Sequence, residues 1–417
     1  MNKSATLMAG VAAIALLSSP IYAAKAKSGG TSEPAPVAMP VDDSRIDQLN
    51  QRIDALEAEL QQSEMHQAAD HDKVDGWKPM AGWWDNTSIN GRMYYDITNV
   101  SNKRAGVASG TDGFNFDVKR FYVGIDHTFD KVFSANVTTD FTYDGTTKAS
   151  QVYIKKAYLQ AKLDDAFTVR IGSADLPWIP YAEDAYGYRF VENTVADRAK
   201  FGTSADWGVH VLGKLASGLI NYQVSAVSGA GYKAAGSTSF RPEHPDVEGR
   251  VGLDYMGFQL AVGGYWGDLG AMKSNTVFHD ATRFNALAAY KIDGLKVGVE
   301  YFTASNWTQV QSATASHATG VSPFASYQIM PEWSVFGRYD YVKPYSDAAR
   351  SSFHNDYYNI GIDYSPAKII DFALVYKHDG GYGGNFADAN GTIGGTAFAP
   401  GNSGNYNEVG LFGQLRW

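Results

Sequence analysis

Cysteine is absent from this chain of 417 residues, and its absence removes several classes of site at once. Without thiols the chain has no disulfide framework, no thiolate metal site and no cysteine nucleophile. After the first two dozen residues the sequence also lacks any run of about 18 apolar residues, the length that a transmembrane helix needs. The sequence therefore predicts no helical membrane domain beyond its N-terminus.

Patterns that carry catalysis or cofactor binding are also scarce. The histidines after position 100 are scattered without metal-ligand spacing: His127, His210, His244, His279, His317, His354 and His378. No glycine-rich phosphate loop and no basic nucleic-acid patch occurs. We therefore expect no enzyme activity, no cofactor, no metal and no nucleic-acid partner. A membrane-barrel hydrolase stays a less favoured alternative, because its catalytic residues would come from distant parts of the chain.

Aromatic residues and glycine are plentiful by contrast. The chain has 26 tyrosines, 9 tryptophans and 43 glycines, with a formal net charge of −9. A soluble protein rarely carries so many large aromatic side chains, whereas a transmembrane β-barrel uses them in girdles at its two membrane interfaces.

The N-terminus has the three parts of a secretory signal peptide. Lys3 supplies a positive charge, residues 7–17 an apolar core, and Ala23 a small residue at the cleavage site. The pattern predicts removal of residues 1–23, with cleavage after Ala26 as the alternative. The chain is therefore expected to be exported.

A short helix is predicted between two linkers, residues 24–44 and residues 63–86. Within residues 45–62 the apolar residues follow a heptad a/d pattern: Ile46, Leu49, Ile53, Leu56 and Leu60. Arg52 and Glu57 fall at g and e positions, where they can pair between helices, and the segment resembles a known trimer-specifying coiled-coil motif. The alternative is a single helix lying on its own domain, since two heptads alone are marginal in water.

From residue 87 to residue 417 the pattern changes to strands that alternate apolar and polar side chains. Residues 132–143 are typical: Phe133, Ala135, Val137, Phe141 and Tyr143 lie on one face, and Ser134, Asn136, Thr138, Asp140 and Thr142 lie on the other. Tight turns alternate with long polar loops along the chain, as in outer-membrane barrels. We predict an all-β fold: a sixteen-stranded antiparallel transmembrane β-barrel with a short N-terminal coiled-coil helix. A soluble β-sandwich would leave the aromatic strand ends unexplained.

The last thirteen residues, Asn405 to Trp417, read as the closing strand of this barrel. Apolar residues alternate up to the aromatic C-terminus: Val409, Leu411, Gly413, Leu415 and Trp417. This ending resembles the signal by which outer-membrane barrel proteins are delivered to their assembly machinery. The expected location is therefore the bacterial outer membrane, in contact with its lipid.

Several short motifs between residues 114 and 215 resemble the family of phosphate-selective porins within the general bacterial porins. They are Phe116-Asp117-Val118-Lys119-Arg120, residues 134–141, Ile154-Lys155-Lys156-Ala157-Tyr158-Leu159, Val169-Arg170-Ile171-Gly172 and Asp197-Arg198. The resemblance implies a sixteen-stranded trimeric channel for anions, lined by arginines and lysines. Where the family carries paired arginines, this chain has Lys119-Arg120.

Strand counting predicts the position of a constriction. With a first strand at residues 87–98, a fifth at 166–173 and a sixth at 207–215, the segment from Ala174 to Asp206 becomes the third long loop, which folds into the lumen in porins of this size. The candidate pore-lining and constriction residues are Arg92, Arg120, Lys156 and Arg170 on the wall, and Asp175, Glu183, Asp184, Arg189 and Arg198 on the loop. The alternative for this segment is an exposed surface loop.

These observations predict a trimeric outer-membrane porin for passive diffusion of small hydrophilic solutes, with a weak preference for anions, among them phosphate. An adhesin or structural anchor that uses the coiled coil is the alternative function. The sequence leaves open the preferred solute and whether the coil trimerises or contacts peptidoglycan.

Overall fold

The structure, a computed structural model, describes residues 82–417 apart from residue 110 and residues 145–147, 235–241, 273–276, 346–351 and 396–401. The chain divides into two compact units, Met1–Pro79 and Met80–Trp417. The predicted signal peptide, the first linker and the coiled coil lie outside the described residues and stay predictions.

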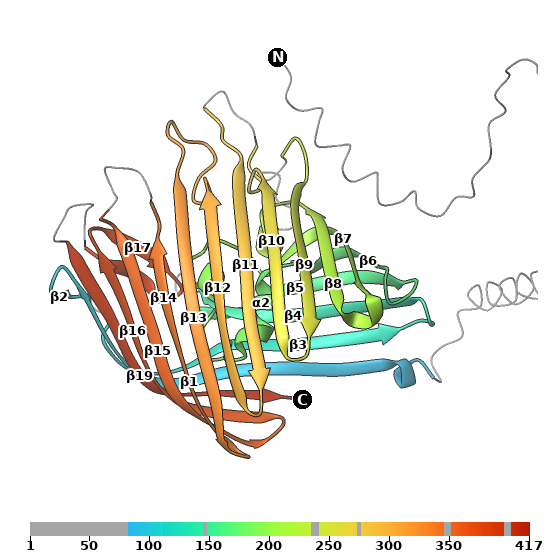
Figure 1. The fold of residues 1–417 in the computed structure, drawn as a ribbon, viewed down its shortest axis with the longest axis horizontal. Helices are drawn as coiled ribbons and strands as arrows, with labels where there is room; N and C mark the ends of the chain where they lie inside the picture. Colours follow the sequence, from blue (N-terminus) through green and yellow to red (C-terminus); the bar gives the residue numbers. More distant parts are fainter. Residues whose placement is uncertain are drawn as a thin grey trace, which may run out of the picture. The chain divides into compact units, whose positions relative to one another are not determined.

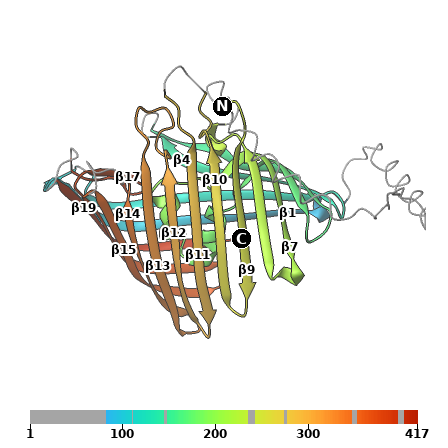
Figure 2. The same ribbon diagram turned by 45° about the horizontal axis from the view of Figure 1, so that its top comes forward.

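Sixteen long antiparallel strands form a closed barrel, as predicted (Figures 1 and 2). The strands are β1 (Thr87–Arg104), β3 (Gly113–Thr128), β4 (Phe133–Asp144), β5 (Ala149–Lys162), β6 (Thr168–Asp175), β7 (Ala205–Leu215), β8 (Ile220–Val227), β9 (Asp246–Tyr255), β10 (Phe258–Gly267), β11 (Ala281–Ile292), β12 (Leu295–Ser305), β13 (His317–Met330), β14 (Trp333–Lys343), β15 (His354–Ala367), β16 (Ile370–Tyr382) and β19 (Ser403–Arg416). Strand β1 pairs with both β3 and β19, and this second pairing closes the ring.

The two ends of the barrel differ in their connections. Turns of two to five residues join strands at one end, which we call the turn end. At the other end, the loop end, all connections are longer except that between β4 and β5, which has four residues. The loop end also carries the short strands β2 (Val107–Ala108), β17 (Asn385–Asp388) and β18 (Gly391–Gly394), and the 3-10 turn η3 (Tyr232–Ala234). The first strand continues six residues past its predicted end at residue 98, to Arg104, because alternation persists up to the first loop.

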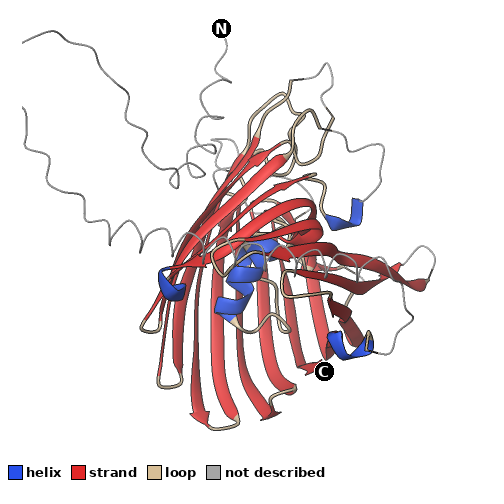
Figure 3. Ribbon diagram, turned by 90° about the vertical axis from the view of Figure 1, so that its right-hand side faces the viewer, coloured by secondary structure: helices blue, strands red, loops and turns tan. Residues whose placement is uncertain are grey.

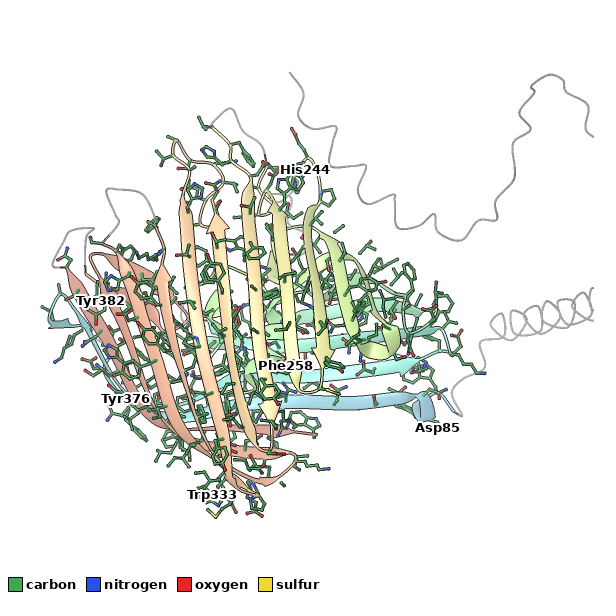
Figure 4. The ribbon with its side chains drawn as sticks, in the orientation of Figure 1. Asp85, His244, Phe258, Trp333, Tyr376 and Tyr382 are labelled. Carbon is green, nitrogen blue, oxygen red and sulfur yellow. The ribbon has the colours of Figure 1, made fainter. Side chains whose placement is uncertain are left out.

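The outer face of the barrel is apolar and exposed. Phe258, Leu260 and Val262 of β10 are 45–53% exposed, although each is a large apolar side chain. Aromatic rings gather at both ends of the outer face; Trp333 marks the turn end and His244 the loop end (Figure 4). An apolar band between aromatic girdles is the outer surface of a transmembrane barrel. No helix within the described ranges has the length and apolar character needed to cross a membrane.

Among the register shifts between the described strands, two are β-bulges that lie within the side of the barrel formed by β1 and β3 to β6. The register between β1 and β3 shifts between Tyr94 and Tyr95, so Lys119 is the extra residue opposite them. The register between β4 and β5 shifts in the same way between Thr138 and Thr139, and here the extra residue is Lys155. A bulge lets two consecutive residues point to the same side of a sheet. Each of these bulges therefore turns a pair of adjacent basic residues toward the barrel interior.

The connection between β6 and β7, residues 176–204, contains the helices α2 (Ile179–Tyr186) and α3 (Val195–Arg198), and we call it the inner segment. It lies within the ring of strands (Figure 3). Its apolar side chains pack on inward-facing residues of β10 to β14, and Trp178 and Ile179 are fully buried there. The protein has this core inside its barrel because apolar residues such as Leu287, Phe302 and Phe324 point inward from the wall.

Candidate channel constriction

Helix α2 presents an apolar face to strands β10 to β14 and an acidic face to strands β1 and β3 to β6. It begins with a proline in its first turn and ends at Gly187, which adopts the left-handed conformation (φ 86°) that glycine tolerates best. Ile179, Ala182 and Ala185 are buried, whereas Glu183 is partly exposed and Asp184 is exposed. The helical period therefore directs two carboxylates into the open part of the lumen.

One end of the inner segment is held by Trp178. Its backbone N–H donates to the Glu248 carboxylate on β9 at 3.0 Å, and its indole Nε1–H donates to Glu300 on β12 at 2.8 Å. Both carboxylates and the tryptophan ring are buried. Buried polar groups need such partners, so these two bonds fix the entry of α2 relative to two strands.

The other end is held by Arg198 of α3, whose side chain is fully buried. Its guanidinium reaches Asp340 at 2.9 Å, Asp379 at 3.1 Å and Asp388 at 2.7 Å, and it donates to the amide oxygen of Asn355 at 2.9 Å. We call this group the Arg198 cluster. It joins the inner segment to β14, β15, β16 and strand β17 at the loop end. Burial and the neighbouring Asp379 raise the pKa of Asp388.

An open cavity of about 780 Å³ lies between α2 and the wall formed by β1 and β3 to β6. The residues that line it are largely polar: Asn90, Arg92, Tyr94, Tyr122, Asp126, Asn136, Thr138, Lys155, Lys156, Tyr158, Asp175, Glu183, Asp184, Arg189, Gln414 and Arg416. A polar lumen beside an apolar outer surface is the arrangement of a water-filled barrel. This cavity is the part of the lumen that the inner segment leaves open.

Most charges around the cavity are paired. Lys156 lies 3.0 Å from Asp175, and Arg189 lies 2.5 Å from Glu183. Arg416 pairs with Asp371 at 2.5 Å. Each ion pair holds its two side chains in place, and its opposite charges cancel much of each other's electric field at a distance.

Two cations of the cavity have no carboxylate within 4 Å among the residues that the structure describes. Arg92 instead contacts the hydroxyl of Tyr94 at 3.2 Å, and Lys155 contacts the hydroxyl of Tyr122 at 3.3 Å. On the opposite side, the Asp184 carboxylate forms no ion pair within the same described ranges. On the wall, the Asp126 carboxylate accepts hydrogen bonds from the side-chain amides of Asn90 and Asn136 and also forms no ion pair within these ranges. The charges without an ionic partner are therefore Arg92, Lys155 and Asp126 on the wall and Asp184 on α2.

The structure brings together most, but not all, of the predicted site residues. Arg92, Lys156, Asp175, Glu183, Asp184 and Arg189 line the cavity. Arg120 lies toward the loop end, paired with Asp140 at 2.9 Å. Arg170 donates to Gln160 at 2.8 Å on the wall, outside the cavity lining. Arg198 is buried on the far side of the inner segment. The predicted set thus spans four separate parts of the barrel interior.

Strict alternation misses two lysines that the bulges turn inward. Lys119 reaches Asp96 at 3.1 Å, and Lys155 lies over the ring of Tyr122. The sequence does contain a signal for both. Apolar residues stand at even positions before each bulge and at odd positions after it: Phe114, Phe116, Val118 and then Phe121, Val123, Ile125; likewise Val152, Ile154 and then Ala157, Leu159. Such a change of parity inside one strand marks an extra residue.

Comparison with solved structures identifies the architecture. The described barrel resembles an anion-selective porin from Comamonas acidovorans, with a TM-score of 0.60 and 10% sequence identity over 79% of this chain and 99% of that chain. OmpT, an outer membrane protein of Vibrio cholerae, gives a TM-score of 0.52 at 13% identity, over 79% of this chain and 97% of its own. A mutant of the Rh. blastica porin gives 0.51 at 14% identity, over 79% and 100%.

The chain has the porin fold. None of the family models and none of the curated proteins matches its sequence. At 10–14% identity the likeness concerns the fold and not the solute. The phosphate-selective family that the sequence motifs resemble is therefore not established by the comparisons, whereas the general porin architecture is.

Proposed function

We propose that this protein is an outer-membrane porin through which small hydrophilic solutes diffuse passively. The observation that supports the proposal most directly is the polar cavity between α2 and the β1–β6 wall, inside a barrel with an apolar outer belt. Sixteen strands give a barrel wide enough to leave an aqueous channel. No group of three metal-ligating side chains occurs in the part of the chain that the structure describes, and we propose no chemistry for the lumen.

The channel is proposed to prefer anions weakly. The cavity lining contains five basic residues against four acidic ones: Arg92, Lys155, Lys156, Arg189 and Arg416 against Asp126, Asp175, Glu183 and Asp184. The excess is a single positive charge, and most of these charged side chains form ion pairs. Because screening acts over about 8 Å at physiological salt, side chains without an ionic partner act most strongly on a passing ion. Arg92 and Lys155 attract anions, whereas Asp126 and Asp184 oppose them and keep the preference weak. Small anions, phosphate among them, are the proposed favoured solutes.

Zero-current potentials in a KCl gradient across planar bilayers test this selectivity. We expect a potential of the sign for chloride preference, and a magnitude well below that of an ideally selective channel. Adding phosphate is expected to change the current gradually with concentration, because phosphate is one permeant anion among others. A potential of the cation sign would contradict the proposal, and block of the chloride current by micromolar phosphate would point to a dedicated phosphate channel.

We further propose that the barrel assembles as a homotrimer and reaches the membrane through recognition of its last strand by the barrel-assembly machinery. Trp417 also joins the end of the last strand, β19, to the first strand, β1. Its N–H donates to the Gly91 carbonyl at 3.2 Å, and its carbonyl accepts from the Gly91 N–H at 3.1 Å. Deleting Trp417 is therefore expected to reduce insertion. The measurement is the amount of heat-modifiable folded protein in outer-membrane fractions, and equal amounts from the deletion and the parent chain would refute the proposal.

A further inference from the structure

A turn in the loop between β8 and β9 places two residues against the lumen side of β5. The turn is η3, and its Tyr232 carbonyl accepts a hydrogen bond from the Trp207 indole at 3.0 Å, which fixes the turn on β7. The Tyr232 ring stacks near Tyr153 of β5, with centroids 6.0 Å apart and planes 26° apart. The Lys233 ammonium lies 4.5 Å from the centroid of the same Tyr153 ring. The loop thus adds a cation to the wall.

Tyr153 connects this lysine to Arg120. The Tyr153 hydroxyl lies 3.2 Å from Arg120 Nη1 and donates to Asp140 at 2.8 Å, while Arg120 pairs with the same carboxylate at 2.9 Å. Lys155 follows two residues after Tyr153 on β5, so its side chain emerges on the same face. Arg120, Lys155 and Lys233 therefore surround the tyrosines on the loop side of the cavity.

Positive charge exceeds negative charge in this group. Asp140 is the one carboxylate that pairs with any of the three cations within 4 Å among the described residues, and it is already held by Arg120 and Tyr153. Burial, followed by Arg120, lowers the pKa of Lys233, and Lys155 acts in the same direction. Like charges held together in this way are stabilised by an anion that lies between them.

We propose that Arg120, Lys155 and Lys233, with Tyr153 and Tyr232, form a capture site for organic carboxylates on the loop side of the constriction. The cations take the carboxylate group, and Arg120 has guanidinium nitrogens beyond the one that it shares with Asp140. The rings of Tyr122, Tyr153 and Tyr232 offer apolar contact to a carbon skeleton, which inorganic phosphate lacks. This inference rests on the proposed porin function and adds a binding step at the loop-side edge of the cavity, whose lining includes Lys155.

A binding step has a distinct electrical signature. Conductance through a channel without a site rises in proportion to salt concentration, whereas conductance through a channel with a site saturates as the site fills. The probe is potassium benzoate at pH 7.5, applied to full-length channels in planar bilayers, with potassium phosphate in a parallel series. We expect benzoate conductance to saturate in the parent chain and phosphate conductance to stay near proportional.

Three substitutions separate the site from the general charge of the channel mouth. Lys233→Gln is expected to raise the half-saturating benzoate concentration about three- to fivefold, the effect of removing one partly exposed ion pair. Lys233→Arg keeps the charge and is expected to retain saturation. Lys148→Gln is the matched control, because Lys148 is an exposed loop lysine about 17 Å before Tyr153 along β5. It is expected to behave as the parent chain does.

The outcomes separate this site from the proposed function. Proportional benzoate conductance in the parent chain overturns the site, as do equal shifts in Lys233→Gln and Lys148→Gln. Saturation with phosphate but not with benzoate overturns the carboxylate class. A zero-current potential in KCl with the sign of cation preference refutes the proposed anion preference by itself. A potential with the sign of anion preference, together with benzoate conductance proportional to concentration, refutes the capture site alone.

Discussion

The two sides of the barrel interior are built from different side chains. On the side formed by β10 to β14, Leu287, Phe302 and Phe324 point inward and the inner segment covers them, which leaves a dry core. On the side formed by β1 and β3 to β6, Arg92 and Lys155 point inward and face the open cavity. We call these the packed side and the open side. A single barrel thus combines an apolar core, as in a globular protein, with a polar cavity.

The difference shows how the constriction is positioned. The packed side holds the inner segment by apolar burial and by the contacts of Trp178 and Arg198, so α2 stands at a fixed place in the lumen. On the open side, Arg92 and Lys155 contact phenol hydroxyls, and Lys156 pairs with the partly exposed Asp175. Changes on the packed side are therefore expected to alter stability, and changes on the open side to alter ion preference.

The largest expected effect comes from Arg198→Met. This change leaves Asp340, Asp379 and Asp388 buried around an uncharged side chain, and removal of one partner from a buried ion pair costs about 3–5 kcal/mol. We expect a large drop in the temperature at which the folded, heat-modifiable form is lost, together with noisier single-channel currents because the inner segment is released.

Two companion variants sharpen this test. Arg170→Met removes an arginine from the open side, where Arg170 contacts Gln160 and the Tyr158 ring, and it is expected to lower the unfolding temperature far less. Adding Asp388→Asn to Arg198→Met removes one of the carboxylates that have lost their arginine partner, and it is expected to restore part of the lost stability. Equal losses from Arg170→Met and Arg198→Met would erase the distinction between the two sides.

A smaller effect on stability, with a clear effect on selectivity, is expected from Arg92→Gln combined with Lys155→Gln. Both side chains contact tyrosine hydroxyls and neither has a carboxylate within 4 Å in the described ranges, so their loss is expected to change stability by less than about 1 kcal/mol. The zero-current potential in a KCl gradient is expected to move toward cation preference. Lys162→Gln, which removes a charge paired with Asp165 at an exposed turn, is the control. An unchanged potential in the double variant would show that the open side does not set selectivity.

The smallest effect on the barrel is expected from deleting residues 45–62, the predicted coiled coil. This deletion removes no residue of the sixteen strands or of the inner segment, so conductance and the zero-current potential are expected to stay unchanged. If the coil supports the proposed trimer, the temperature at which trimers dissociate on gels falls. An unchanged dissociation temperature would assign the segment another role, such as a periplasmic spacer.

The sequence predicts the barrel well because the signal for each strand is local. Alternation of period two extends over about ten residues in each strand, and the tight turns between strands are shorter still. The structure confirms the sixteen strands that these patterns predict. A rule of strict alternation does not predict that Lys119 and Lys155 point inward, because each is the extra residue of a bulge. The sequence does mark both bulges, since the apolar residues change from even to odd positions there.

The position of Arg198 depends on contacts that no local pattern encodes. Its partners Asp340, Asp379 and Asp388 lie 142, 181 and 190 residues away along the chain. Sequence alone assigned Arg198 to the same loop as Glu183 and Asp184, yet the loop presents its two ends to different surroundings. Only closure of the barrel brings β14, β16 and β17 to that end of the inner segment.

The inner segment is clamped at both ends, by Trp178 and by Arg198, and this bears on how sharply the channel sieves. A loop attached at one point samples a range of positions, so the largest solute that passes is set by its rare excursions. A segment fixed at two points about twenty residues apart has a narrow distribution of positions. Permeation rates plotted against solute diameter are therefore expected to fall over a short interval, and to spread over a wider one when either clamp is removed.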